Sequence, residues 1–294
     1  MYVDAIEKAA QFTRPIFFIS RTYGSAIVQP GAATIFFVNA DGWAVTCGHV
    51  ADQIMATDHI NERYRLFKGE LGAYADGKKA KQVRRELERK YHLDRRELAQ
   101  MKVKFVDCLD SFQTLTMQRH KTYDIALLKF EGFEKLLCTE FPVFAPDSGS
   151  LKPGKSLCRL GFPFVEFTDF GYDPDRDEIE WTQTGQHTTP RFPIEGMVTR
   201  HLIGQGAELI GFEMSTPGLR GQSGGPAFDS QGRVWGIQSM TGHLDLDFDV
   251  DQQVRRQGLP KRVQDSAFLH VGGCVHIQII KEFMRSLNVT FVEG

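Results

Sequence analysis

A serine set among glycines is the strongest candidate for chemistry in this chain, because residues 221–226 read GQSGGP. Glycine allows tight turns, so the Ser223 hydroxyl can stand at the apex of a turn while nearby backbone N–H groups converge on one point. An acyl-transfer enzyme needs both features: an exposed nucleophile and donors for the developing oxyanion. A glycine-rich surface turn is the alternative, and it does not explain the whole hexamer.

A serine hydroxyl needs a general base, and the base needs an acid that orients it. His49 lies in TCGHVA (residues 46–51), after a strand, a turn at residues 39–42 and a second strand, and we expect it on a short helical turn. Asp124 lies in YDIALL (residues 123–128), at the mouth of an otherwise apolar strand. A carboxylate there is costly to bury unless it is hydrogen-bonded, and a histidine N–H would satisfy it.

Other interpretations of the base and the acid stay open at this point. His49 is one of nine histidines, and most histidines lie at the surface or in satisfied core positions. Asp124 could cap a turn instead, as aspartate commonly does. Asp107 and Asp110 are its nearest rivals, but neither lies in a D-I-A-L-L run.

Taken in the order His49, Asp124, Ser223, the three segments resemble those of the chymotrypsin-like serine proteases, and this order separates them from subtilisins and α/β-hydrolases. The residues around these motifs resemble the bacterial trypsin-like and high-temperature-requirement proteases more closely than digestive trypsin. The resemblance covers about residues 15 to 290, with gaps. Three more stretches carry it: FFVNADGWAVT (36–46), LCRLGFP (157–163) and GRVWGIQS (232–239).

This resemblance implies an all-β fold of two six-stranded antiparallel barrels, with the active site in the cleft between them. It implies that Ser223 attacks the scissile carbonyl, that His49 carries the proton and that Asp124 holds the imidazole, with no cofactor and no metal. The backbone N–H groups of Gly221 and Ser223 would form the oxyanion hole. The segment that pairs with the substrate backbone would be Ser239, Met240 and Thr241.

The chain departs from the digestive enzymes at three positions. Gln222 stands where they carry an aspartate that pairs with a newly cut N-terminus. Pro217, six residues before the nucleophile, stands at the floor of the primary specificity pocket, so a preference for lysine or arginine is not implied. Thr241 replaces a glycine at the pocket entrance. We therefore expect a small or medium apolar side chain in this pocket.

The composition is that of a globular protein, with 294 residues, 41% of them hydrophobic, and a formal net charge of −2. This charge favours neither nucleic acid nor an anionic membrane as a partner. No apolar stretch approaches the roughly 18 residues of a membrane span, and the N-terminus lacks a signal-peptide pattern. Five cysteines without paired spacing predict reduced, mostly buried thiols in a cytoplasmic protein.

We predict two domains, joined near residues 142–154, where proline and glycine cluster. The first spans residues 1–145 and contains the histidine and the aspartate, with a helical insertion at about 56–102. Within that insertion, residues 78–101 are rich in helix formers. The second domain spans residues 146–294 and contains the serine.

Helices are also expected at both ends of the chain, at residues 4–11 and 275–287, and a first strand at residues 16–19. Two further stretches exceed what the barrels need. Residues 164–193 contain an acidic, turn-prone loop that we expect to shape or gate the active site. Residues 242–267 contain alternating aspartates, which would share one side of an extended segment and need basic partners. These are Asp245, Asp247, Asp249 and Asp251; an EF-hand calcium motif is absent.

These observations predict a serine endopeptidase, bacterial by resemblance, that acts on a protein or peptide. Unchecked proteolysis in the cytosol would be harmful, so we expect a partner, a ligand or assembly to gate the activity. One alternative is a latent pseudoprotease or regulatory scaffold whose oxyanion hole is collapsed. Gln222 and the long stretch at 242–267 are compatible with this alternative. The other alternative is an esterase that uses the same triad.

Overall fold

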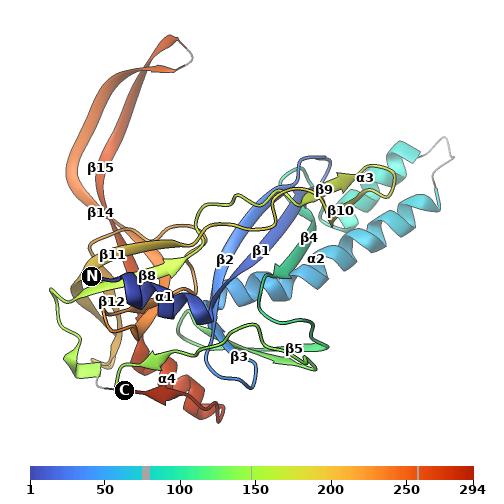
Figure 1. Ribbon diagram of the computed structural model, residues 1–294. Helices are drawn as coiled ribbons and strands as arrows, with labels where there is room; N and C mark the ends of the chain where they lie inside the picture. Colours follow the sequence, from blue (N-terminus) through green and yellow to red (C-terminus); the bar gives the residue numbers. More distant parts are fainter. Residues whose placement is uncertain (75–79, 147, 257) are drawn as a thin grey trace.

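Two mainly antiparallel sheets, one from each half of the chain, form the body of the protein (Figure 1). The prediction of a mostly β, chymotrypsin-like fold with a helical insertion and a C-terminal helix is confirmed; the exact domain boundary stays a prediction. Parts of three predictions lie outside the described residues, namely residues 75–79 of the insertion, Asp147 of the joint and Gln257 of the stretch at 242–267. The computed structural model describes residues 1–74, 80–146, 148–256 and 258–294.

The N-terminal sheet has six strands in the order β4-β1-β2-β3-β6-β5 and curls into a half-barrel. Strand β1 contains the expected apolar run at residues 16–19, whose side chains are buried. Because side chains alternate along a strand, Ile16 and Phe18 pack into the main core, whereas Phe17 and Ile19 pack on the opposite face with Phe167. The strands are β1 (Thr13–Thr22), β2 (Gln29–Phe37), β3 (Trp43–Thr46), β4 (Leu98–Phe105), β5 (Thr114–Arg119) and β6 (Ala126–Glu131).

The C-terminal sheet has eight strands in the order β13-β8-β11-β12-β15-β14-β7-β16. Strand β13 also pairs with β14, so the six strands from β13 to β14 close into a ring. Full closure satisfies the backbone groups that an open sheet would leave at its edges. The strands are β7 (Val143–Phe144), β8 (Ser156–Gly161), β11 (Phe192–Ile203), β12 (Leu209–Met214), β13 (Pro226–Phe228), β14 (Arg233–Arg256), β15 (Leu259–His276) and β16 (Val292–Glu293), with a short 3-10 turn, η1 (Ser148–Ser150), after β7.

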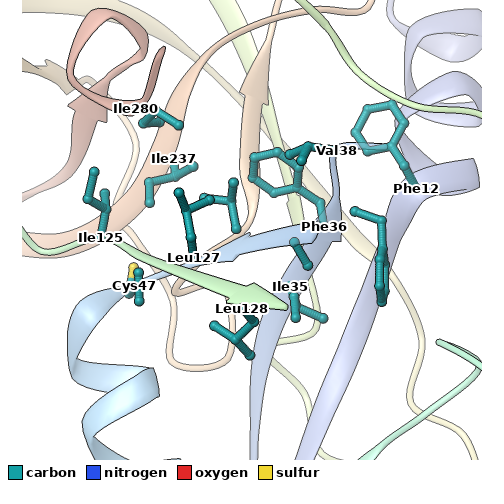
Figure 2. Packing of buried hydrophobic residues seen from close by; sticks show 14 of the residues in the cluster. Phe12, Ile35, Phe36, Val38, Cys47, Ile125, Leu127, Leu128, Ile237 and Ile280 are labelled. Atoms are coloured by element: carbon teal, nitrogen blue, oxygen red, sulfur yellow. The ribbon is translucent and has the colours of Figure 1, made fainter. Parts of the chain in front are cut away.

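The terminal helices lie where the sequence predicts them, as α1 (Val3–Phe12) and α4 (Ile277–Ser286). The His276 side chain caps α4 by accepting the backbone N–H of Gln278 at 3.1 Å. Figure 2 shows the apolar cluster that joins the two halves, in which Ile237 of β14 and Ile280 of α4 pack with Leu127 of β6. This shared core fixes the two sheets relative to each other.

The helical insertion differs from its prediction in two ways. The expected short turn at the histidine is the start of a 25-residue helix, α2 (Gly48–Gly72). A second helix, α3 (Ala80–Lys90), follows, but residues 98–101 belong to strand β4 and the prediction of a helix there is wrong. Strand β4 pairs with the edge of β1, and this tertiary pairing overrides the helix propensity of residues 98–101. No helix among the described residues is long and apolar enough to cross a membrane.

The stretch at 164–193 forms a small hairpin of β9 (Phe170–Asp173) and β10 (Glu178–Trp181). Its acidic turn packs against α2 and β1, because Asp177 accepts hydrogen bonds from Tyr64 Oη on α2 at 2.5 Å and from Arg21 Nη2 on β1 at 2.7 Å. The turn therefore links the two halves of the chain.

The stretch at 242–267 belongs to a long hairpin of β14 and β15 that projects from the body (Figure 1). The expected one-sided row of aspartates is interrupted, because the strand register shifts between Asp245 and Asp249 and Asp247 adopts a left-handed φ of 57°. The expected pairing with basic residues occurs between Asp251 and Arg262, whose Nε lies 2.9 Å from Oδ1.

Candidate active site

The aspartate and the histidine meet at the ends of neighbouring strands. Strand β3 pairs with β6, with Thr46 opposite Ala126, so the residues just after β3 and just before β6 are adjacent. His49 follows β3 on the first turn of α2, and Asp124 precedes β6. His49 Nδ1 lies 2.8 Å from Asp124 Oδ2, and the His49 backbone N–H donates to Asp124 Oδ1 at 2.8 Å.

A third donor completes the environment of this carboxylate. Ser239 Oγ on β14 donates to Asp124 Oδ2 at 2.6 Å. Burial by itself raises the pKa of the Asp124 carboxyl, but the hydrogen bonds from His49 and Ser239 outweigh it and lower the pKa to about 2. The rival Asp110 instead accepts the backbone N–H groups of Ser111 and Lys135, as a turn aspartate does.

The serine turn needs its glycines. Gly221 and Gly224 adopt left-handed φ angles of +94° and +88°, and a Cβ at either one would collide with a backbone oxygen, Phe162 O or Thr34 O. The turn is fastened to the N-terminal sheet, since Thr34 donates from its backbone N–H to Ser223 O at 2.9 Å and from Oγ1 to Gly221 O at 2.6 Å. The nucleophile candidate is therefore held by residues of both halves.

The donors in this turn divide into used and unused groups. Gly224 N–H donates to Gln238 O at 2.9 Å, and Gly225 N–H donates to Gln222 O at 2.8 Å. The N–H groups of Gly221 and Ser223 donate to no acceptor in the described part of the chain. These two are the groups assigned to the oxyanion hole from sequence.

Gln222 stabilises the same turn without a charge. Its side chain is buried, its Oε1 accepts the Leu219 N–H at 3.2 Å, and its Nε2 donates to Phe192 O at 3.2 Å. The amide therefore holds the turn through internal hydrogen bonds, at the position where the digestive enzymes use an ion pair.

Ser223 and His49 line one cleft of about 980 Å³. The His49 side chain is 44% exposed. Phe164, the first residue of the stretch at 164–193, and Pro163 just before it lie on the wall of the same cleft. Among the residues that the structure describes, no hydrogen bond joins Ser223 Oγ to the His49 ring. Such bonds are commonly long before substrate binds.

The predicted substrate-binding residues line two walls that touch each other. Thr241 Oγ1 donates to Gly218 O at 2.7 Å, and a Cβ at Gly218 would collide with the Gln238 side chain. Met240 is exposed beside them. The carbonyl oxygen of Pro217 accepts a hydrogen bond from Arg159 Nη2 at 3.0 Å. The two segments for which the sequence predicts a specificity pocket are thus in direct contact.

Arg159 is the residue of this region that the sequence analysis missed. It lies on β8 and is fully buried. The signal was present in the sequence, because a charged residue stands in the middle of the apolar stretch LCRLGF at residues 157–162. A buried charge in an apolar strand needs a reason.

Three side chains near the cleft could in principle bind a metal ion instead. Ligand atoms of Cys47, His49 and Asp124 lie within 4.8 Å of one another. However, burial raises the pKa of the Cys47 thiol well above its ordinary value, and its Sγ donates to Gln238 O at 3.1 Å. A neutral, engaged thiol is a poor ligand, so the geometry suits a histidine–carboxylate pair better than a metal.

Comparisons with known proteins fit this geometry. The model of the trypsin-like peptidase domain family matches residues 33–237. Among solved structures, the HtrA-type protease AlgW, solved with a decapeptide, is similar with a TM-score of 0.50 and 13% sequence identity, over 97% of this chain and 67% of that chain. At this identity the likeness concerns the fold alone. No curated protein matches the chain.

Proposed function

Because this chain belongs to the trypsin-like peptidase domain family, we propose that it is a serine endopeptidase that cleaves peptide bonds in a protein or peptide substrate. The observation that carries the proposal is the hydrogen-bonded pair of His49 and Asp124, which shares a cleft with the Ser223 turn. In that turn the N–H groups of Gly221 and Ser223 donate to no acceptor among the described residues. Base, orienting acid, nucleophile and oxyanion donors are the parts that acyl transfer requires.

The reaction proceeds through these groups in two halves. Ser223 Oγ attacks the carbonyl carbon, and its proton moves to His49 Nε2. The oxyanion of the tetrahedral intermediate accepts hydrogen bonds from the N–H groups of Gly221 and Ser223. When the C–N bond breaks, the leaving amine takes the proton from His49. Water then hydrolyses the acyl-enzyme by the same route and restores the Ser223 hydroxyl.

Asp124 sets the state of the histidine. With Nδ1–H donated to the carboxylate, the Nε2 lone pair is left for the serine proton. The pKa of about 2 keeps Asp124 ionised at neutral pH, so the carboxylate stabilises the imidazolium that forms during the reaction.

The substrate is proposed to bind as an extended strand along residues 239–241. Met240 is exposed there, as a strand that accepts a peptide must be. That the HtrA-type neighbour was solved with a decapeptide supports a peptide in the cleft of this chain as well.

We also propose that the protein is gated by a partner, a ligand or assembly. The hydrogen bond from Thr241 to Gly218 closes the pocket, and Ser223 and His49 are not yet joined by a hydrogen bond, which together favour a resting form. The latent scaffold therefore remains the second candidate function. A cytoplasmic location is also a proposal, supported by five buried free cysteines.

Digestion of unfolded casein, followed by mass spectrometry of the products, tests the proposal. Wild type should release defined peptides at the low rate of a gated resting form, and Ser223→Ala, with one oxygen atom fewer, should release none. Hydrolysis of activated esters without peptide products would indicate the esterase. An inert wild type that also leaves esters intact would indicate the scaffold.

A further inference from the structure

Arg159 is a buried cation without a counterion. Its Nη2 donates to Thr216 O at 2.9 Å, Thr216 Oγ1 at 2.6 Å and Pro217 O at 3.0 Å, and its Nη1 donates to Gln238 Oε1. All of these acceptors are neutral. Its Nε has no hydrogen-bond partner, and no carboxylate of the described residues forms an ion pair with it. Burial lowers the pKa of Arg159, but a guanidinium stays protonated at neutral pH.

The other buried cations of the described chain are treated differently. Arg21 pairs with Asp177 at 2.7 Å, and Lys281 lies 3.4 Å from Glu293 Oε2. A buried charge is strongly unfavourable when nothing of opposite sign faces it. The other buried cations of the described chain thus pair with a carboxylate, whereas Arg159 does not. A bound ligand with a negative charge would supply the missing counterion.

The guanidinium lies between the two segments for which the sequence predicts the specificity pocket. It contacts the carbonyls of Thr216 and Pro217 on one wall and the side chain of Gln238 on the other. A Cβ at Gly272 on β15 would collide with Nη1, so the guanidinium fills the space that a side chain at this position would take. The sequence predicts the pocket floor at Pro217, where no charge stands; the charge in this region belongs to residue 159 instead.

We propose that Arg159 selects substrates with a glutamate or aspartate side chain at the residue preceding the cleaved bond. The inference rests on the proposed peptidase function and names its substrate class. The substrate carboxylate would replace the Gln238 amide oxygen on Nη1, exchanging a neutral acceptor for a charged one. Charge-assisted hydrogen bonds of this kind are about twice as strong as neutral ones.

The closed walls fit this assignment. Gln238 Nε2 also donates to Met240 O at 2.6 Å, so the amide is held between the guanidinium and the substrate-pairing segment. An apolar side chain would gain nothing from displacing it, since Arg159 would lose an acceptor. An acidic side chain supplies a better acceptor and the missing negative charge. The preference for an apolar side chain expected from Pro217 and Thr241 is replaced by this proposal.

The first test measures binding with the inert Ser223→Ala variant, so that it does not depend on turnover. The probes are two peptides with blocked ends and a single fluorophore that differ only by glutamate or glutamine at the residue before the cleavage site. We expect the glutamate peptide to bind about tenfold more tightly by fluorescence anisotropy. Equal affinity, tighter binding of glutamine, or no binding of either peptide would overturn the proposal.

The second test profiles cleavage of a mixed peptide library by wild type, Arg159→Met and Arg159→Lys. Cleavage after acidic residues should be lost in the Met variant and partly kept in the Lys variant. The control Arg262→Met removes an arginine from the exposed part of the β14–β15 hairpin and should keep the wild-type profile. Circular dichroism checks that each variant is folded, and the binding test stands if Arg159→Met is not.

The two proposals fail separately. If wild type cleaves the library but not after acidic residues, the pocket assignment is wrong and the peptidase stands. If Ser223→Ala prefers the glutamate peptide while wild type cleaves nothing, the pocket assignment stands and the peptidase is wrong.

Discussion

The two sides of the proposed active site differ in how completely their polar groups are satisfied. On the catalytic side, both oxygens of Asp124 accept hydrogen bonds from His49 and Oδ2 accepts a further one from Ser239. On the pocket side, Arg159 is buried and pairs with no carboxylate of the described residues, and the Thr241 hydroxyl donates to Gly218 O across the two walls. Both sides are formed by β-strands and the loops next to them, so the type of secondary structure does not explain the difference in hydrogen bonding.

This contrast indicates that the His49–Asp124 pair is preorganised in the free protein, whereas Arg159 would gain a charged partner only when substrate binds. A preorganised pair needs no rearrangement when charge develops, and this favours the transition state. A charge that lacks a partner in the free protein gains most when a substrate of opposite sign arrives. Catalytic power and substrate choice would thus be located on opposite sides of one cleft.

Asp124→Asn should break the catalytic side with the largest effect. The asparagine keeps the shape but cannot stabilise the imidazolium and can favour the wrong histidine tautomer, so we expect kcat to fall about 10⁴-fold. KM for a peptide should change little, because the pocket is untouched. Steady-state kinetics on a casein-derived peptide measure both constants. A fall of less than about tenfold would show that His49 does not depend on this carboxylate.

Acid should weaken the catalytic side in a defined pH range. The folded-state pKa of Asp124, about 2, lies below its ordinary value of 3.8, so its contribution to stability is present above about pH 4 and is lost as the pH falls towards 2. The contribution is at most about 2 kcal/mol, since the side chain is 29% exposed and partly screened.

Urea unfolding at several pH values compares wild type with Asp124→Asn. The free energy of unfolding of wild type should exceed that of the variant at pH 5 by more than it does at pH 2. A difference between the two proteins that is the same at both pH values would contradict the assigned role of the carboxylate in stability.

Thr241→Val should sharpen the contrast with the smallest effect, because it releases the pocket side alone. The valine has the shape of threonine but cannot donate to Gly218 O, and one hydrogen bond is worth about 1 kcal/mol. We expect cleavage of a peptide substrate to rise about fivefold. Thr241→Ser keeps the hydroxyl and serves as the control. If both variants behave like wild type, the hydrogen bond does not hold the pocket closed.

The proposed catalytic residues could be predicted from sequence because each lies in a short segment whose own residues restrict its conformation or its burial. The glycines around Ser223 are required by left-handed φ angles, and Asp124 stands before an apolar strand that would tolerate it only with a donor. The strand pairing of β3 with β6 then brings Asp124 to His49. The structure places these residues together as expected; their catalytic roles remain a proposal.

The missed features depend on contacts between distant segments. Residues 98–101 carry helix formers and become a strand because the edge of β1 is available to them. The length of α2 was missed because only a few of its side chains are buried, so its apolar pattern is weak. The position of Arg159 depends on Pro217, Gln238 and Gly272, and no single window of sequence contains all four residues.

Labelling with a fluorescent alkyl phosphonate tests the central claim most directly, because the reagent reacts only with a serine that has a working base and oxyanion hole. Wild type should be labelled, and Ser223→Ala should not. Mass spectrometry should place the adduct on Ser223. Labelling of Ser223→Ala to the same extent, or an adduct on another residue, would contradict a serine peptidase built on His49, Asp124 and Ser223.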